Sequence, residues 1–406
     1  MLSKGTVGIH QQTTDTNPCS HIFKKNIIQM AVRKYAMFIA LIVIALLFQW
    51  LTQGILLAPM NVSKLIMQNS YILILAIGML PCILTGDIDL SVGSVIAVVG
   101  AIAGTMLISM KMSVGLTIAV CLVVGLLIGA WQGFWVAFAK VPSFIVTLAG
   151  MLLFRGATMV ILDGNTLSPF PESFQFIAQK FLADIPLIGE IPYSTILVGI
   201  IVAICYVISE INARKQNMQY GVKVSSKKNF LAKLSLVTFV CLYAAYWLNQ
   251  FKGMPIILLL LAALIISYSF VTHRTVIGRH IYALGGNERA TQLSGIKTKW
   301  VRFFVFVNMG LLAAIAGLVF SARLNCAGPT AGNGFELDAI AACYIGGASA
   351  TGGVGTIVGA IVGGLVMGVL NNGMSIMGIG IDWQMGIKGL VLLIAVGFDI
   401  YNQAKK

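Results

Sequence analysis

Long apolar runs are the feature that most constrains how this chain can fold. A helix needs about 20 apolar residues to cross a bilayer, and runs near that length recur along almost the whole sequence: 36–57, 70–86, 91–110, 114–138, 143–162, 193–209, 233–249, 255–272, 301–322, 337–350, 355–371 and 384–400. With 58% hydrophobic and only 10% charged residues, the chain has too little polar surface for a soluble enzyme or a nucleic-acid module. We predict an all-α integral membrane protein, a polytopic helical bundle of about 12 transmembrane helices.

The runs 36–57 and 337–350 differ from the others in their position and length. The run 36–57 is longer than the apolar part of a signal peptide and lacks a cleavage site after it, so we expect a retained helix. The run 337–350 is short, and it is either a half-helix packed inside the bundle or a full crossing. Since no linker or extramembrane domain interrupts the pattern, residues 36–403 are expected to form a single transmembrane domain.

The basic residues predict the orientation of the bundle. If every run crosses and residues 1–35 form a cytoplasmic tail, twenty of the 27 Lys and Arg lie in inside segments. Five lie outside (Lys64, Lys111, Lys180, Lys252 and Arg323), and Arg155 and Lys388 lie within runs. This bias is what the positive-inside rule expects, and it puts both termini in the cytoplasm. It also explains the net charge of +14 without a nucleic-acid partner.

Three connections between the runs are long. Residues 163–192 carry four Pro and are predicted to form an amphipathic periplasmic loop. Residues 210–233 are predicted to be a basic cytoplasmic loop, either facing lipid headgroups or offering a partner surface. Residues 278–300 form the third, also cytoplasmic.

Acidic residues interrupt the apolar pattern at Thr85–Ser94. Ionisable groups at membrane depth are costly and often functional, so Asp87 and Asp89, with Ser91 and Ser94, are candidates for the translocation pathway. The alternative is structural: Asp89 or Ser91 caps the helix that begins there.

A second acid-x-acid element, Glu336-Leu337-Asp338, also opens a helix of small residues. In the predicted topology the first element lies toward the cytoplasm and the second toward the outside. Broken helices on opposite sides are typical of an inverted repeat in a transporter. Glu336 and Asp338 are therefore further candidates for the pathway or its gating.

Glycine and cysteine patterns add structural detail. The spacing of Gly125, Gly129 and Gly133, and the cluster 346–355 with the glycines that follow it, indicate close helix packing, and the cluster indicates a break or a re-entrant segment. The seven Cys and four His show no metal-ligand spacing, so we expect neither a metal site nor a disulfide. The chain has no phosphate-binding G-x-x-x-x-G-K-[ST] motif, and we expect no cofactor.

A short polar helix is predicted within the loop 278–300. Asn287 can cap it, Glu288 in the first turn suits the positive end of the helix dipole, and Gly295 can end it. As a bare pattern this is an ordinary loop helix.

The chain resembles the membrane-spanning permeases of bacterial ABC importers for monosaccharides, the ribose, xylose and arabinose group. The resemblance runs from about residue 36 onward, and it is carried by GDIDLSVGS (86–94), VPSFIVTLAGMLLFRG (141–156), GRHIYALGGNERATQLSGI (278–296), ELDAIAACYIGG (336–347) and NNGMS (371–375). The PSFIVTLAGM stretch and the segments near 193–249 are most similar to the xylose-type permease. Thr291, where that type tends to have Ala, departs from the pattern.

The resemblance implies a protein of the bacterial inner membrane with three protein partners: a second copy of itself, a cytoplasmic ATP-binding subunit and a periplasmic sugar-binding protein. Membrane lipid surrounds the subunit. The short helix becomes a coupling helix that docks into the ATPase, with contributions from Asn287, Glu288, Leu293, Ser294 and Gly295. The chain itself is then not an enzyme.

The function we expect is the pore subunit of an ATP-driven importer that moves a monosaccharide, D-xylose or a related aldose, by alternating access. An ion-coupled secondary sugar transporter is the alternative, because Asp87, Asp89, Glu336 and Asp338 could form an ion site. An integral-membrane enzyme lacks a supporting cluster of His and carboxylates.

Overall fold

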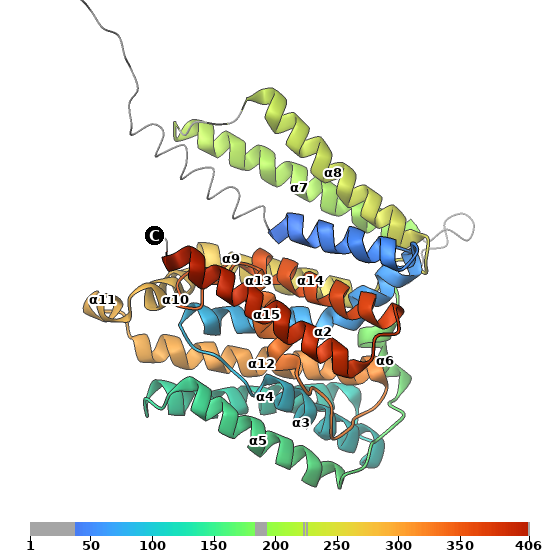
Figure 1. The fold of residues 1–406 in the computed structure, drawn as a ribbon, viewed down its shortest axis with the longest axis vertical. Coiled ribbons are helices and arrows are strands. Elements are labelled where there is room, and N and C mark those ends of the chain that lie inside the picture. Colours follow the sequence, from blue (N-terminus) through green and yellow to red (C-terminus); the bar gives the residue numbers. More distant parts are fainter. Residues whose placement is uncertain (1–36, 183–192, 222–223, 225, 405–406) are drawn as a thin grey trace, which may run out of the picture.

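The computed structural model describes residues 37–182, 193–221, 224 and 226–404, and its elements are helices (Figure 1). An apolar helix at Met37–Leu51 precedes the labelled series. The series comprises α2 (Pro59–Leu84), α3 (Val92–Gly104) continued by the π-helical turn η1 (Thr105–Ser109), α4 (Val114–Ala137), α5 (Ser143–Leu162), α6 (Glu172–Gln179), α7 (Tyr193–Gln219), α8 (Lys227–Asn249), α9 (Ile256–Arg274), α10 (Val276–Gly286), α11 (Glu288–Leu293), α12 (Thr298–Leu324), α13 (Phe335–Ile345), α14 (Ile357–Ile376) and α15 (Ile381–Ala404). The predicted tail 1–35 and residues 183–192 of the predicted periplasmic loop lie outside the described residues.

Nine helical segments among the described residues are long and apolar enough to cross a membrane. They account for nine of the predicted runs, and the other three coincide with the helix Met37–Leu51, with α13 and with α15. The prediction of an all-helical polytopic membrane protein is confirmed. The number of crossings and the side on which the termini lie stay predictions.

The central helices are buried and the outer ones are apolar but exposed. In the most apolar window of α2 and of α14, 83% of the residues are buried, compared with 11% in α8. A helix that is apolar all round and exposed suits contact with lipid rather than water. In Figure 1, α7 and α8 form a hairpin at the edge of the bundle, next to the helix Met37–Leu51.

The bundle has two ends, which we name after the short helices found there. At the α11 end, the backbone N–H of Gly353 donates to the carbonyl of Leu84, the last residue of α2, at 2.9 Å. At the α6 end, Leu167 and Ala327 pair as an isolated antiparallel bridge. Figure 1 shows α11 and α6 at opposite extremes of the long helices.

Two segments pass between these ends as broken helices. After α2, the chain runs non-helically over 85–91 and then continues as α3 toward the α6 end, where Gly104 packs against Leu167 and Ala327. After α12, the residues before α13 are likewise non-helical or turn-like, and α13 then runs toward the α11 end. The two segments therefore have opposite directions, as the predicted inverted repeat requires. The sequence allowed either a half-helix or a full crossing for 337–350. Helix α13, with 11 residues, is a half-helix.

The two half-helices begin at the same place inside the bundle. A Cβ added at Gly93, in the first turn of α3, would collide with the carbonyl oxygen of Gly332 and with the carboxylate of Glu336. A Cβ at Gly332, which has φ of +71°, would collide with the carbonyl of Gly93. Glycine is required here because the two backbones touch.

Glycines at the predicted spacings in α4 and α14 pack these helices closely against their neighbours. Gly125, Gly129 and Gly133 of α4 each lie against backbone carbonyls of α12. Gly359 and Gly363 of α14 lie against the end of α13 and the loop after it.

The prediction that residues 210–233 form a loop is wrong, because most of this segment is helical. Helix α7 continues to Gln219 and α8 begins at Lys227. The two helices are joined beyond their apolar parts by an ion pair of 2.7 Å between Lys233 and Glu210. Opposite charges on the two arms allow the hairpin to continue past the apolar run, which the count of basic residues alone could not indicate.

We predict that Gly93→Ala destabilises the folded protein, because the added methyl group forces apart two backbones that cannot yield. Overpacking of this kind typically costs about 1–3 kcal/mol. Thermal unfolding of the purified protein in detergent measures the effect. The matched control is Gly156→Ala in α5, where a Cβ meets nothing within 4 Å, so that its melting temperature should equal or exceed that of the wild type. Equal melting temperatures for Gly93→Ala and the wild type would contradict the tight junction.

Candidate functional site

Helix α11 is a capped helix, built as its sequence predicts. The Asn287 side chain accepts a hydrogen bond from the backbone N–H of Ala290 at 2.9 Å, which satisfies a free donor of the first turn. Glu288 occupies the first turn. Gly295 follows the helix with φ of +83°, a conformation that favours glycine.

Helix α11 protrudes from the bundle and exposes an apolar side chain. Leu293 is 85% exposed, although α11 lies at an end of the bundle and not on its apolar flank (Figure 1). Ser294 is exposed beside it, and its hydroxyl donates to the Ala290 carbonyl at 2.9 Å. Leu293 is therefore accessible to a partner protein at this end of the bundle.

Arg302 joins α11 to the first broken helix. Its Nε donates to Asp87 Oδ2 at 2.8 Å, and its two terminal nitrogens donate to the two carboxylate oxygens of Glu288, each at 3.2 Å. Asp87 is buried, whereas Glu288 is half exposed. The guanidinium is planar and fixes both carboxylates at once. Arg302 therefore connects α11 by direct contact to the segment 85–91.

The tyrosine of α10 holds the neighbouring loop. Tyr282 donates from its hydroxyl to the carbonyl of Gly355 at 2.7 Å. Burial raises the pKa of Tyr282 above its ordinary value. Helix α10 is thus tied to the glycine-rich loop 346–356 that leads into α14.

The polar groups of the first broken helix bind one another. Asp89 is 1% exposed and accepts hydrogen bonds from the backbone N–H and the hydroxyl of Ser91, at 2.8 and 2.7 Å. The amide of Gln132 in α4 donates to the Ser91 hydroxyl. Ser94 donates to the Ser91 carbonyl at 2.7 Å. The suggested side-chain cap on α3 is wrong: Ser91 is the N-cap residue, but its hydroxyl bonds to Asp89 and Gln132 instead of the helix's free N–H groups.

The second broken helix is held by the two cations that the sequence places within apolar runs. Arg155 of α5 donates to the carbonyls of Pro329 and Ala331, at 3.1 and 2.6 Å, in the non-helical stretch before α13. Lys388 of α15 donates to Asp338 at 3.1 Å. Non-helical backbone within a membrane is tolerated only where protein or water satisfies it, and Arg155 does so here.

A small cavity of about 200 Å³ lies beside the Asp338–Lys388 pair. Its lining includes Tyr71, Leu337 and Met385. Asp338 itself is buried, and Leu337 is 52% exposed on the surface of the half-helix.

The structure therefore brings several of the predicted residues together. Asp87 and Glu288, assigned separately to pathway and coupling, come together through Arg302, and Glu336 reaches the start of α3 at Gly93. Asp89, Ser91 and Ser94 form a separate buried network.

Sequence reasoning missed Arg302, Gln132, Arg155 and Lys388 as partners. The sequence could have indicated Arg155 and Lys388 as partners, since each is a charge inside an apolar run. For Arg302 the indication was weaker, because it lies at the very start of the run 301–322.

The sequence is similar to a known protein family and to curated permeases. The family described as "Branched-chain amino acid transport system / permease component" matches residues 61–396, which include every candidate site residue. The chain belongs to this permease family. With its nine span-length helices among the described residues, it is a multi-pass protein of the bacterial inner membrane.

Its relatives match over most of their length. The xylose transport system permease protein XylH of Haemophilus influenzae is 40% identical over 95% of this chain and 100% of its own. The XylH protein of Escherichia coli K12 is 42% identical over 90% of this chain and 91% of its own. The ribose import permease protein RbsC of the same bacterium is 34% identical over 84% of this chain and 86% of its own. No solved structure matches the chain significantly.

Proposed function

We propose that this chain is the transmembrane pore subunit of an ATP-driven importer for a monosaccharide, D-xylose or a related aldose. The observation that carries the proposal is the identity of 40% and 42% with two xylose permeases over nearly their full length. Identity with the ribose permease is lower, at 34%, which favours xylose over ribose.

Energy would enter through α11. Its exposed Leu293 offers an anchor for a cytoplasmic ATP-binding subunit, and its Glu288 passes movement to Arg302 and Asp87. In this arrangement Asn287 caps the start of the helix and Gly295 ends it. Glu288 binds Arg302, and Leu293 and Ser294 would face the partner. This supports the expected coupling roles of the five residues.

Movement would reach the pathway through the first broken helix. The segment 85–91 leads directly into α3, whose first turn touches the start of α13 at Gly93 and Gly332. Because α3 and α13 run to opposite ends of the bundle, a shift at their junction alters access at both ends. Asp87, Asp89, Ser91, Ser94, Glu336 and Asp338 line or support this junction in the proposed mechanism. By its resemblance to the permeases of ABC importers, the chain would work as two copies around one pore, with a periplasmic binding protein supplying the sugar.

The pairing of the carboxylates weighs against an ion-coupled transporter. Two of the four candidate carboxylates already have a cationic partner: Asp87 forms an ion pair with Arg302, and Asp338 forms one with Lys388. A carboxylate that already holds a protein cation is a poor ligand for a coupling ion, because the cation must first be displaced. An ATP-driven mechanism needs no such site in this chain.

Uptake of labelled xylose tests the proposal directly. We expect proteoliposomes containing this chain, its ATP-binding subunit and the binding protein to take up xylose only with ATP, and to continue when a protonophore removes the proton gradient. Labelled L-leucine is the matched substrate control, because the family description names branched-chain amino acids. Uptake that persists without the ATP-binding subunit and stops with the protonophore would contradict the proposal. Uptake of leucine in place of xylose would contradict the substrate.

The coupling role of α11 makes a second prediction. Glu288→Gln removes the charge that binds Arg302 while keeping the size of the side chain. We expect this variant to co-purify with the ATP-binding subunit but to lose most of the sugar-stimulated ATP hydrolysis. Leu293→Ala should instead weaken co-purification, since it removes the anchor. Arg289→Gln, which changes the neighbouring exposed charge on the same helix, is the control and should keep both properties. Wild-type behaviour of both Glu288→Gln and Leu293→Ala would show that α11 is ordinary connecting structure.

A further inference from the structure

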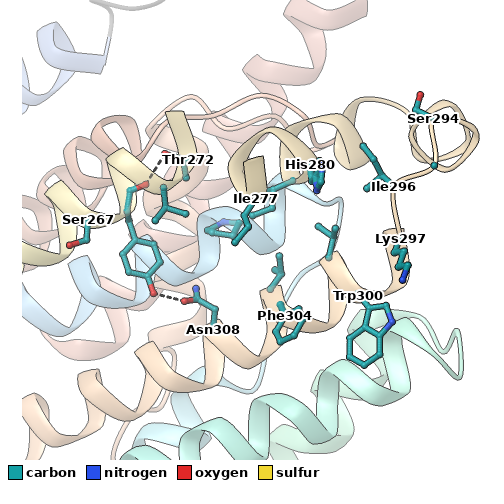
Figure 2. Close-up of a pocket in the computed structure, with 17 residues that line it drawn as sticks. Ser267, Thr272, Ile277, His280, Ser294, Ile296, Lys297, Trp300, Phe304 and Asn308 are labelled. Atoms are coloured by element: carbon teal, nitrogen blue, oxygen red, sulfur yellow. Dashed lines mark hydrogen bonds between the residues drawn. The ribbon is translucent and has the colours of Figure 1, made fainter. Parts of the chain in front are cut away.

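A large cavity lies beside the site described so far and shares Ser294 and Gly295 with it, between α9, α10 and α12 at the α11 end (Figure 2). We call it the α9–α12 groove. Its volume is about 770 Å³, which is within the range of roughly 300–1,000 Å³ typical of ligand sites. The loop 294–297 that follows α11 closes one side, and Pro81 of α2 contributes to the lining.

The interior of the groove is apolar. Val271, Ile281, Val301 and Val305 are among the apolar residues that line it. The polar side chains of Tyr268 and Thr272 are already hydrogen-bonded: the Tyr268 hydroxyl bonds to Asn308, and the Thr272 hydroxyl donates to the Tyr268 carbonyl at 2.8 Å. A polar solute would find few free groups to orient it, whereas a hydrocarbon chain needs none.

The rim of the groove is also apolar and lies on the surface of the bundle. Ile277 is 62% exposed, Phe304 58% and Trp300 48%. Such a rim is unfavourable in water and suits the boundary between hydrocarbon and headgroups, where Trp is enriched. Both α9 and α12 are among the helices that can cross the membrane, so the groove is bounded by spanning helices.

Lys297 is the one charged side chain among the described residues that line the groove, and it lies at the α11 end. His280 also lines that end, and the described lining contains no carboxylate. Figure 2 shows Lys297 and His280 toward the loop side, with Asn308 at the other end. Basic pockets between membrane helices bind anionic headgroups, and each Lys near a membrane surface contributes about 1 kcal/mol of attraction.

We propose that the α9–α12 groove is a binding site for an anionic phospholipid, with one acyl chain along the apolar wall and the phosphate at Lys297. The inference uses the membrane location of the chain and does not rest on the sugar or on ATP coupling. The bound lipid contacts the loop 294–297, so it packs directly behind α11.

Native mass spectrometry of the purified, delipidated full chain tests this site. The protein is titrated with phosphatidylglycerol, with phosphatidylcholine of the same acyl chains, and with inorganic phosphate. We expect one phosphatidylglycerol to bind roughly fivefold more tightly than phosphatidylcholine. Phosphate alone should not compete, because it cannot occupy the apolar wall. Equal binding of the two phospholipids, or competition by phosphate, would overturn the proposal in favour of a non-selective lipid contact or a free-anion site.

Two pairs of variants assign the preference to the groove. Lys297→Glu should abolish the preference for phosphatidylglycerol, whereas Lys299→Glu, an exposed charge outside the lining, should retain it. Ile277→Trp fills the groove and should weaken the binding of both phospholipids. Val276→Trp alters the adjacent exposed residue outside the lining and should leave their binding unchanged. Equal effects within either pair would show that the lipids bind elsewhere on the bundle.

Discussion

The architecture depends on the contact between the first turn of α3 and the residues before α13. Two helices that begin inside a membrane bundle leave backbone groups that cannot bind water or lipid, so protein must satisfy them. Gly93 and Gly332 allow the two backbones to touch, and Arg155 binds the carbonyls of Pro329 and Ala331 beside them. Without this junction, both half-helices would have to be extended across the membrane or expelled from it.

The charged groups inside the bundle follow the same requirement. A buried charge is tolerated when a partner is in reach, and Asp338 has Lys388 while Asp87 has Arg302. The Arg302 pair has a further consequence, because the same guanidinium also holds Glu288 on the protruding helix α11. One side chain thus connects a surface available to a partner with the non-helical segment that precedes α3.

Much of this could be predicted from the sequence. The apolar runs predicted the helices, and local chemistry predicted α11, with Asn287 as its cap and Gly295 at its end. Such features depend on residues close together in the chain. The partners of Asp87, Asp338 and Ser91 could not be predicted, because each comes from a helix distant in sequence. The length of α7 and α8 was also missed, since the pair between Lys233 and Glu210 forms only once the hairpin has folded.

The central claim is that ATP changes which end of the bundle gives access to the junction of the broken helices. Leu337, half exposed at the start of α13, is a suitable reporter position. A Leu337→Cys variant of the assembled transporter can be labelled with a membrane-impermeant thiol reagent from either side of sealed vesicles, with the wild type measuring the background of native cysteines. The account predicts labelling from one side at a time, with the reactive side changing when ATP binds. Labelling whose side is unaffected by ATP, or labelling from both sides at once, would contradict it.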